Sequence, residues 1–300
     1  MAFVVRELWQ KGEYVELVDI LHDAIQELEE KDTSSMTPEE LQAHRKKLQL
    51  YYNGKYLGLN RIGKYELAIK CANDYIAKYS ATEPEPHVAK AEALFALKEY
   101  EKAIECLNTV IKLCPREVEP ILNKCLALNN LGRYDECLQW ADIGLRIIRS
   151  EEETTALQES PLDPFEDDTK QKRSKNDRWV AEFYTAKAVA LSKQSSWQPA
   201  LECAEEALRR HPTSSRSLEV KALSLVELNK VDEALEIAEQ ILSSNPKNIL
   251  AMHVRTRCLV RSKRLADAVM QLDKIIVTQQ RTGSTVLDPV KPYLEKSAVL

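Results

Sequence analysis

Apolar residues recur along this chain at the spacing of α-helices. The segments Pro120–Leu131 and Leu218–Leu228 carry them at intervals of three and four, which places them on one face of a helix. Glycine occurs 7 times in 300 residues, well below the average of roughly 7%. Because positive-φ turns and bulges use glycine, this scarcity disfavours β-sandwiches and nucleotide-binding loops. The pattern predicts an all-α protein.

One turn signature repeats about every 34 residues and defines what we call the anchor positions. The anchors of six copies are Tyr65, Tyr100, Tyr134, Trp197, Val231 and Leu265, with spacings of 35, 34, 63, 34 and 34. Three positions after the anchors lie small residues: Ala68, Ala103, Cys137, Ala200, Ala234 and Ala268. Nine positions before them lie Tyr56, Ala91, Cys125, Ala188, Ala222 and Thr256. Fifteen positions after three of the anchors lie Pro115, Pro212 and Pro246.

Each copy is interpreted as two antiparallel helices. Gly63 and Gly132 lie two residues before their anchors, where a turn between helices favours glycine. The small residues let the two helices approach closely, and the prolines end the second helix. Since one helix pair cannot bury its own apolar face, neighbouring pairs must stack.

In these features the chain resembles tetratricopeptide repeat proteins. The resemblance rests on Gly63, Tyr65 and Ala68 and on the matching positions of later copies, and it covers residues 49–148 and 179–282. It implies an all-α, right-handed α-α superhelix (solenoid) of about seven helix pairs. A degenerate copy opens the chain at Lys11-Gly12-Glu13-Tyr14, and the last copy, with Gln280 in the proline position, is also degenerate.

Two insertions interrupt the period and suggest the domain organisation. The first, near residues 31–47, contains Thr37, Pro38 and Glu40, which predict a capping box and a lengthened helix. The second, residues 151–178, is acidic and then basic with few apolar residues, which predicts disorder. We therefore expect repeats over 1–150 and 179–300, the latter ending in the start of a capping helix. Ser150 and Ser160 flank acidic or proline residues and are candidate phosphorylation sites.

Catalytic chemistry finds no support in the sequence. The five histidines are scattered, and no phosphate loop, nucleophile elbow or dinucleotide fingerprint is present. Cys71, Cys106 and Cys203 share one slot in three repeats, which sets them roughly 10 Å apart by helix packing. Zinc ligands converge on one centre, so packing is the better interpretation. We predict no catalytic residue, no metal and no cofactor, and hence no enzyme.

The resemblance implies that the first helix of each repeat lines a concave groove for a protein partner. Its inward positions, counted from the anchors, are apolar in the centre with an acidic edge at Glu85, Glu92 and Glu119. The candidate groove residues are Asn53, Leu57, Val88, Glu92, Phe95, Leu122, Asn123, Leu126, Asn129, Val189, Leu223, Val226, His253 and Arg257. Acidic residues repel a carboxylate tail, so a peptide or amphipathic helix fits better than the acidic chaperone tail that some family members bind.

Charge and cysteine content set the remaining expectations. A net charge of −5 disfavours nucleic-acid partners, and no apolar run reaches the ~20 residues of a membrane span. Seven cysteines, an odd number, are typical of reduced thiols in the cytoplasm. We predict a scaffold, adaptor or complex subunit. The alternatives are a targeting or regulatory module of a larger enzyme or co-chaperone cut at residue 300, and an RNA-binding helical repeat. No signal for an oligomeric state is present.

Overall fold

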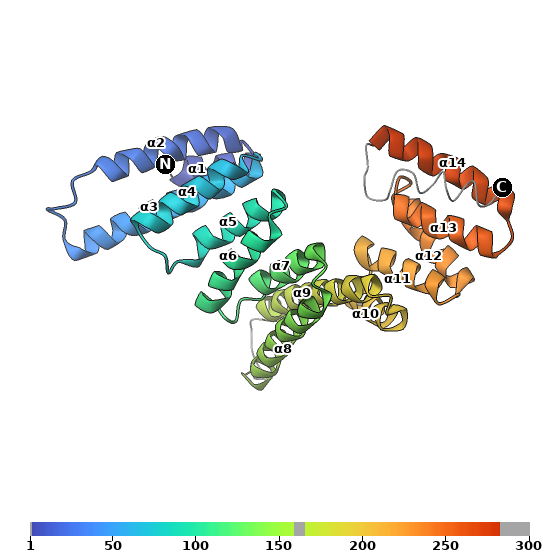
Figure 1. The fold of residues 1–300 in the computed structure, drawn as a ribbon. Helices are drawn as coiled ribbons and strands as arrows, with labels where there is room; N and C mark the ends of the chain where they lie inside the picture. Colours follow the sequence, from blue (N-terminus) through green and yellow to red (C-terminus); the bar gives the residue numbers. More distant parts are fainter. Residues whose placement is uncertain (1, 159–165, 283–300) are drawn as a thin grey trace. The chain divides into compact units, whose positions relative to one another are not determined.

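The computed structural model describes residues 2–158 and 166–282, and within them every regular element is an α-helix (Figure 1). Fourteen helices follow one another in these residues, in agreement with the seven predicted pairs. They are α1 (Ala2–Lys11), α2 (Tyr14–Glu30), α3 (Pro38–Arg61), α4 (Tyr65–Lys78), α5 (Pro84–Ala96), α6 (Tyr100–Leu113), α7 (Val118–Leu131), α8 (Tyr134–Gln158), α9 (Glu166–Lys193), α10 (Trp197–Arg210), α11 (Ser215–Glu227), α12 (Val231–Ser244), α13 (Ile249–Arg261) and α14 (Leu265–Thr282).

The helices form two compact units that meet in sequence between Leu131 and Gly132. The first unit holds α1 to α7 and the second holds α8 to α14. The sequence analysis set the boundary at residue 150, because it assigned α8 to the repeats before the insertion. In the structure α8 instead packs against α9, with the Phe183 ring fully buried beside Gly144. This contact assigns α8 to the second unit.

A left-handed residue connects the two helices of every pair. It always lies two positions before the anchor, with φ between 59° and 76°, at Gly12, Gly63, Lys98, Gly132, Ser195, Asn229 and Lys263. In six of these turns the next N–H bonds back to a leucine carbonyl of the first helix, as from Lys64 to Leu59 at 2.9 Å. This is a Schellman-type helix end. Its presence at Gly12 and at Lys263 confirms the degenerate first and last copies.

The position three residues after the anchor has no exposed surface in the six copies that carry a small residue there. The first copy has Leu17 at this position, and it is also fully buried. Helix α3 of the next copy approaches α2 closely, since a Cβ at Gly58 would lie 2.8 Å from Val18. In this copy the small residue that permits close approach therefore lies on the helix that follows α2.

The proline position sets the length of the second helix. Helices α6, α10 and α12 each have 14 residues and end two residues before Pro115, Pro212 and Pro246. Helices α8 and α14, which lack this proline, run for 25 and 18 residues. Helix α4 ends at the same length without a proline, so proline is sufficient for this stop but not necessary.

The first insertion has the predicted structure. The Glu40 N–H donates to Thr37 Oγ1 at 3.3 Å, and the Thr37 N–H donates to Glu40 Oε2 at 2.8 Å, which completes the capping box. Helix α3 then runs for 24 residues, past Tyr56 to Arg61.

The second insertion is described in part, and its predicted disorder stays a prediction. Helix α8 extends to Gln158 and α9 begins at Glu166. Both helices are anchored in the core, at Ile148 and Phe183. Continuing an existing helix costs far less than nucleating one, and charged residues such as Glu and Lys have high helix propensity. Residues 159–165 and the predicted capping segment 283–300 lie outside the described residues.

The left-handed turns predict opposite effects for two substitutions. Gly63→Ala should lower the free energy of unfolding by about 1 kcal/mol, although a Cβ there meets no atom within 4 Å, because only the backbone conformation opposes it. Lys98→Gly should raise it by about 0.5 kcal/mol. Urea unfolding followed by circular dichroism measures both. A change in the free energy of unfolding of the same sign for both variants would contradict this explanation.

Contact between α8 and α9 predicts a second effect. A Cβ at Gly144 would overlap the buried Phe183 ring. Gly144→Ala should therefore lower the free energy of unfolding by about 2–3 kcal/mol, although alanine normally stabilises a helix interior. In a double-mutant cycle followed by urea unfolding, Gly144→Ala should cost less free energy of unfolding when Phe183→Leu is also present than when Phe183 is retained. Additive effects would show that the two positions do not interact.

Candidate partner-binding pocket

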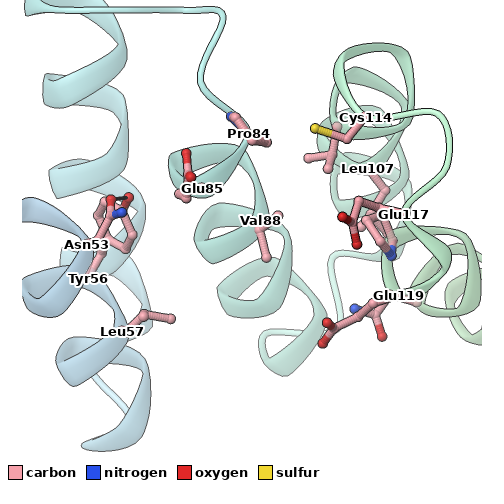
Figure 2. A pocket seen from close by; sticks show the side chains of 13 residues that line it. Asn53, Tyr56, Leu57, Pro84, Glu85, Val88, Leu107, Cys114, Glu117 and Glu119 are labelled. Carbon is pink, nitrogen blue, oxygen red and sulfur yellow. Dashed lines mark hydrogen bonds between the residues drawn. The ribbon is translucent and has the colours of Figure 1, made fainter. Parts of the chain in front are cut away.

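A pocket of about 290 Å³ opens in the first unit among α3, α5, α6 and α7. Figure 2 shows side chains from these helices converging on it from both sides of α5. The lining residues are Asn53, Tyr56, Leu57, Pro84, Glu85, Val88, Leu107, Val110, Cys114, Glu117, Glu119, Pro120 and Asn123. We call this set the α5 pocket.

Its floor is apolar. Tyr56, Leu107, Val110 and Pro120 are buried beneath it, and each of the first three is at most 2% exposed. Leu57, Pro84, Val88 and Cys114 are half-buried and present the accessible apolar surface. Figure 2 places Val88 between the Leu57 side and the Leu107 side. An apolar side chain entering here would lose its contact with water.

The rim is acidic. Glu85, Glu117 and Glu119 are exposed and come from α5, the α6–α7 turn and the first turn of α7. None of the three carboxylates forms an ion pair or side-chain hydrogen bond with any residue that the structure describes. All lining residues are neutral or negative. Burial, followed by the negative charge of Glu85, raises the pKa of Tyr56 above its ordinary range.

Two side-chain amides add hydrogen-bonding capacity. Asn53 and Asn123 are half-buried in the lining, on α3 and α7. Asn53 Oδ1 accepts from the Tyr56 hydroxyl. Neither amide nitrogen donates to a described side chain or carbonyl. These donors can bind oxygen atoms of an occupant.

Four of the predicted groove residues therefore lie together. Asn53, Leu57, Val88 and Asn123 line one pocket, although they come from three consecutive repeats. Glu85 and Glu119, which the sequence placed at inward positions, complete its rim.

The other predicted positions of the first unit lie outside the α5 pocket. Glu92 is exposed and accepts a hydrogen bond from Asn60 Nδ2 at 3.3 Å. Desolvation by the surrounding protein raises the pKa of its carboxyl group. Phe95 packs edge-on against Tyr100 with ring centroids 5.1 Å apart. Leu126 is 37% exposed and Asn129 is half-buried.

The prediction that Leu122 lines the groove is wrong, because its side chain is buried and only 5% exposed. Its neighbour Asn123 lines the pocket, and successive residues of an α-helix point about 100° apart. Leu122 is thereby turned into the core between helices.

Within the described residues, the candidate groove residues of the second unit do not line one common pocket. Val189 and Leu223 are half-buried. Val226 and His253 are 0% and 7% exposed, so the prediction that they line an open groove is wrong. Arg257 donates to Glu227 Oε1 at 2.5 Å and is not a free cation.

The sequence analysis missed one wall of the pocket. Leu107, Val110 and Cys114 belong to the second helix α6 or its C-terminal end, and Glu117 follows it. The prediction considered only first helices. Pro115 marks the end of α6, so a search of the residues beside this proline would have found Cys114 and Glu117.

The cysteines are free thiols. Burial raises the pKa of the Cys71 thiol to about 11 and also raises the pKa values of Cys106 and Cys203, so these thiols stay protonated at neutral pH. Within the described residues, no group of three or more His, Cys, Asp or Glu side chains is arranged to hold a metal. A search of the same residues finds no helix with the length and apolar character of a membrane span.

Of the two candidate phosphorylation sites, one is described. Ser150 lies exposed in α8, where its hydroxyl donates to the Ile147 carbonyl at 2.8 Å. Ser160 lies outside the described residues. Modification of either serine stays a prediction.

Comparisons with known proteins agree with this repeat architecture. Residues 84–117 match the tetratricopeptide repeat family, and residues 193–275 match the family described as anaphase-promoting complex, cyclosome, subunit 3. No curated protein sequence matches the chain.

Solved structures show the same fold at low sequence identity. A tetratricopeptide repeat protein from Parabacteroides merdae ATCC 43184 is 13% identical, with a TM-score of 0.61 over 92% of this chain and 91% of that chain. MamA from Desulfovibrio magneticus RS-1 is 15% identical, with a TM-score of 0.50 over 66% of this chain and 94% of that chain. Residues 84–117 thus match a tetratricopeptide repeat, and the solved structures show that the chain has the fold of tetratricopeptide repeat proteins.

Proposed function

We propose that this protein is a non-enzymatic adaptor or complex subunit whose α5 pocket binds a short segment of a partner protein. One observation carries the proposal: first-helix positions from three consecutive repeats converge on an open apolar pocket. Tetratricopeptide repeats form a protein-interaction fold, so a partner protein is the occupant class that this architecture favours. The free thiols fit a reducing compartment such as the cytoplasm.

The amides favour an extended segment over a helix. Extended chains leave backbone carbonyl groups unpaired, whereas a helix satisfies most of its own. Asn53 and Asn123 can donate to such carbonyl groups from opposite sides of α5. Three adjacent helices span roughly 20 Å at ordinary packing distances, a length that about six extended residues cover.

The remaining exposed or half-buried positions define where the groove would continue. On α5 and α7 these are Glu92, Phe95, Leu126 and Asn129. In the second unit, Val189, Leu223 and Arg257 are also accessible, and we propose them as separate contacts of that unit. The proposal assigns them secondary contacts, because they lie outside the α5 pocket.

Two alternatives have weaker support. The match of residues 193–275 to an anaphase-promoting complex subunit family favours a role in a larger assembly, as a complex subunit or as a module of a larger protein. An RNA-binding function requires cations along the phosphate path, and the α5 pocket has none.

We expect removal of the apolar contacts to abolish partner binding. The variant Leu57→Gln with Val88→Gln keeps the net charge and changes two half-buried pocket residues. A quantitative pull-down from cell lysate should lose specific proteins by at least about tenfold, which corresponds to roughly 1.4 kcal/mol. The matched control, Val15→Gln with Leu67→Gln, changes two exposed apolar residues outside this pocket and should retain them. Identical recoveries for both variants would contradict the proposal.

Two neighbouring leucines of α7 should separate stability from binding. Leu122→Asp buries a carboxylate without a partner and should lower the free energy of unfolding by about 3 kcal/mol or more. Leu126→Asp changes an exposed residue and should alter it by no more than about 0.5 kcal/mol. Urea unfolding followed by circular dichroism distinguishes them. Similar losses for both would mean that α7 faces the core differently.

A further inference from the structure

The charges of the α5 pocket define the chemistry of its occupant. We infer that it is a short partner segment in which an apolar residue is flanked by lysine or arginine, an inference that rests on the proposed function. The apolar residue occupies the floor at Leu57 and Val88, and the cations meet the carboxylates of Glu85, Glu117 and Glu119.

Two chain segments contribute these carboxylates, the first turn of α5 with Glu85 and the start of α7 with Glu117 and Glu119. Figure 2 shows Glu85 on one side of Val88 and both Glu117 and Glu119 on the other, so negative charges lie on two sides of the floor. No described residue neutralises them through an ion pair. Like charges held around one opening repel one another, and a cation in the opening relieves that repulsion.

Two first-helix carboxylates of the second unit have partners in the same unit. In the second unit, Glu227 binds Arg257 at 2.5 Å and Glu219 accepts from Asn248 at 2.7 Å. Both partners, Asn248 and Arg257, belong to the next repeat, at the N-terminal cap of α13 and within α13. The unpaired rim of the α5 pocket is available to cations from outside the chain.

The same rim selects against anionic occupants. A phosphorylated peptide, an acidic tail or a nucleic-acid backbone would bring negative charge against three carboxylates while the lining offers no cation. Lysine and arginine suit the opening in a second way, because their aliphatic stems can lie on the apolar floor while the charged ends reach the rim.

A selection from random peptides tests the inference directly, because it does not require the partner to be identified. The full chain is panned against a display library, and the enriched peptides are synthesised and titrated by fluorescence anisotropy. We expect an apolar residue flanked by lysine or arginine in the enriched set. Binding should weaken as salt rises, since exposed charge pairs are screened.

Charge-removing variants give the quantitative result. Glu85→Gln with Glu117→Gln and Glu119→Gln should weaken binding of the enriched peptides by at least about tenfold and remove most of the salt dependence. The matched control, Glu27→Gln with Glu66→Gln and Glu105→Gln, removes the same charge from exposed positions outside the pocket and should change binding by less than about twofold. Circular dichroism confirms that both variants fold.

The pocket variant Leu57→Gln with Val88→Gln separates the two proposals. If enriched peptides lose binding to this variant but are neutral or acidic and unaffected by the glutamate changes, the inference is overturned and the proposed function stands. If they bind this variant as tightly as the intact chain, or if no peptide is enriched, the proposed function fails and the inference fails with it.

Discussion

Close approach between neighbouring helices is the constraint on which this structure depends. The position three residues after the anchor is fully buried in all seven copies, whether alanine, cysteine or leucine occupies it. Where leucine occurs, at Leu17, the facing helix carries Gly58. In the α8–α9 contact, Gly144 likewise accommodates Phe183. The requirement is therefore on the summed volume of a facing pair, and either helix can supply the small member.

The turn between helices converts this contact into a repeat. One left-handed residue reverses the chain in the same way seven times, and in six of these turns the N–H that follows it bonds to a leucine carbonyl of the preceding helix. Four of the seven turns use residues other than glycine, at Lys98, Ser195, Asn229 and Lys263. Those turns are strained locally, so packing of the flanking helices must hold them in place. This explains why the turn geometry persists in copies whose sequence signature has degenerated.

Fold and site differ in how far the sequence determines them. The period, the small residues and the capping box of Thr37 and Glu40 are local signals, and each has its predicted structure. For the second insertion, low apolar content predicts disorder, and the flanking helices α8 and α9 extend into it from a packed core. Groove residues depend on rotation about each helix axis, which a count from the anchor fixes only to within one position. Leu122 and Asn123 are adjacent in sequence, yet one is core and the other is pocket. The wall from α6 depends on which second helix stands behind the groove, and no pattern within one repeat contains that information.

Burial and pairing, rather than residue type, therefore distinguish a candidate binding position from a structural one in this chain. Apolar residues at inward positions are shared by both units, but Val226 is fully enclosed whereas Val88 remains accessible. Both units carry glutamates on or beside first helices, but Glu227 pairs with Arg257 whereas Glu85, Glu117 and Glu119 have no ion-pair partner in the described structure. A repeat fold builds the same helix pair many times, so its function must arise where neighbours leave polar and apolar groups unsatisfied together. The α5 pocket combines both kinds of group, and complementing both at once requires an occupant that is apolar at its centre and cationic at its edges.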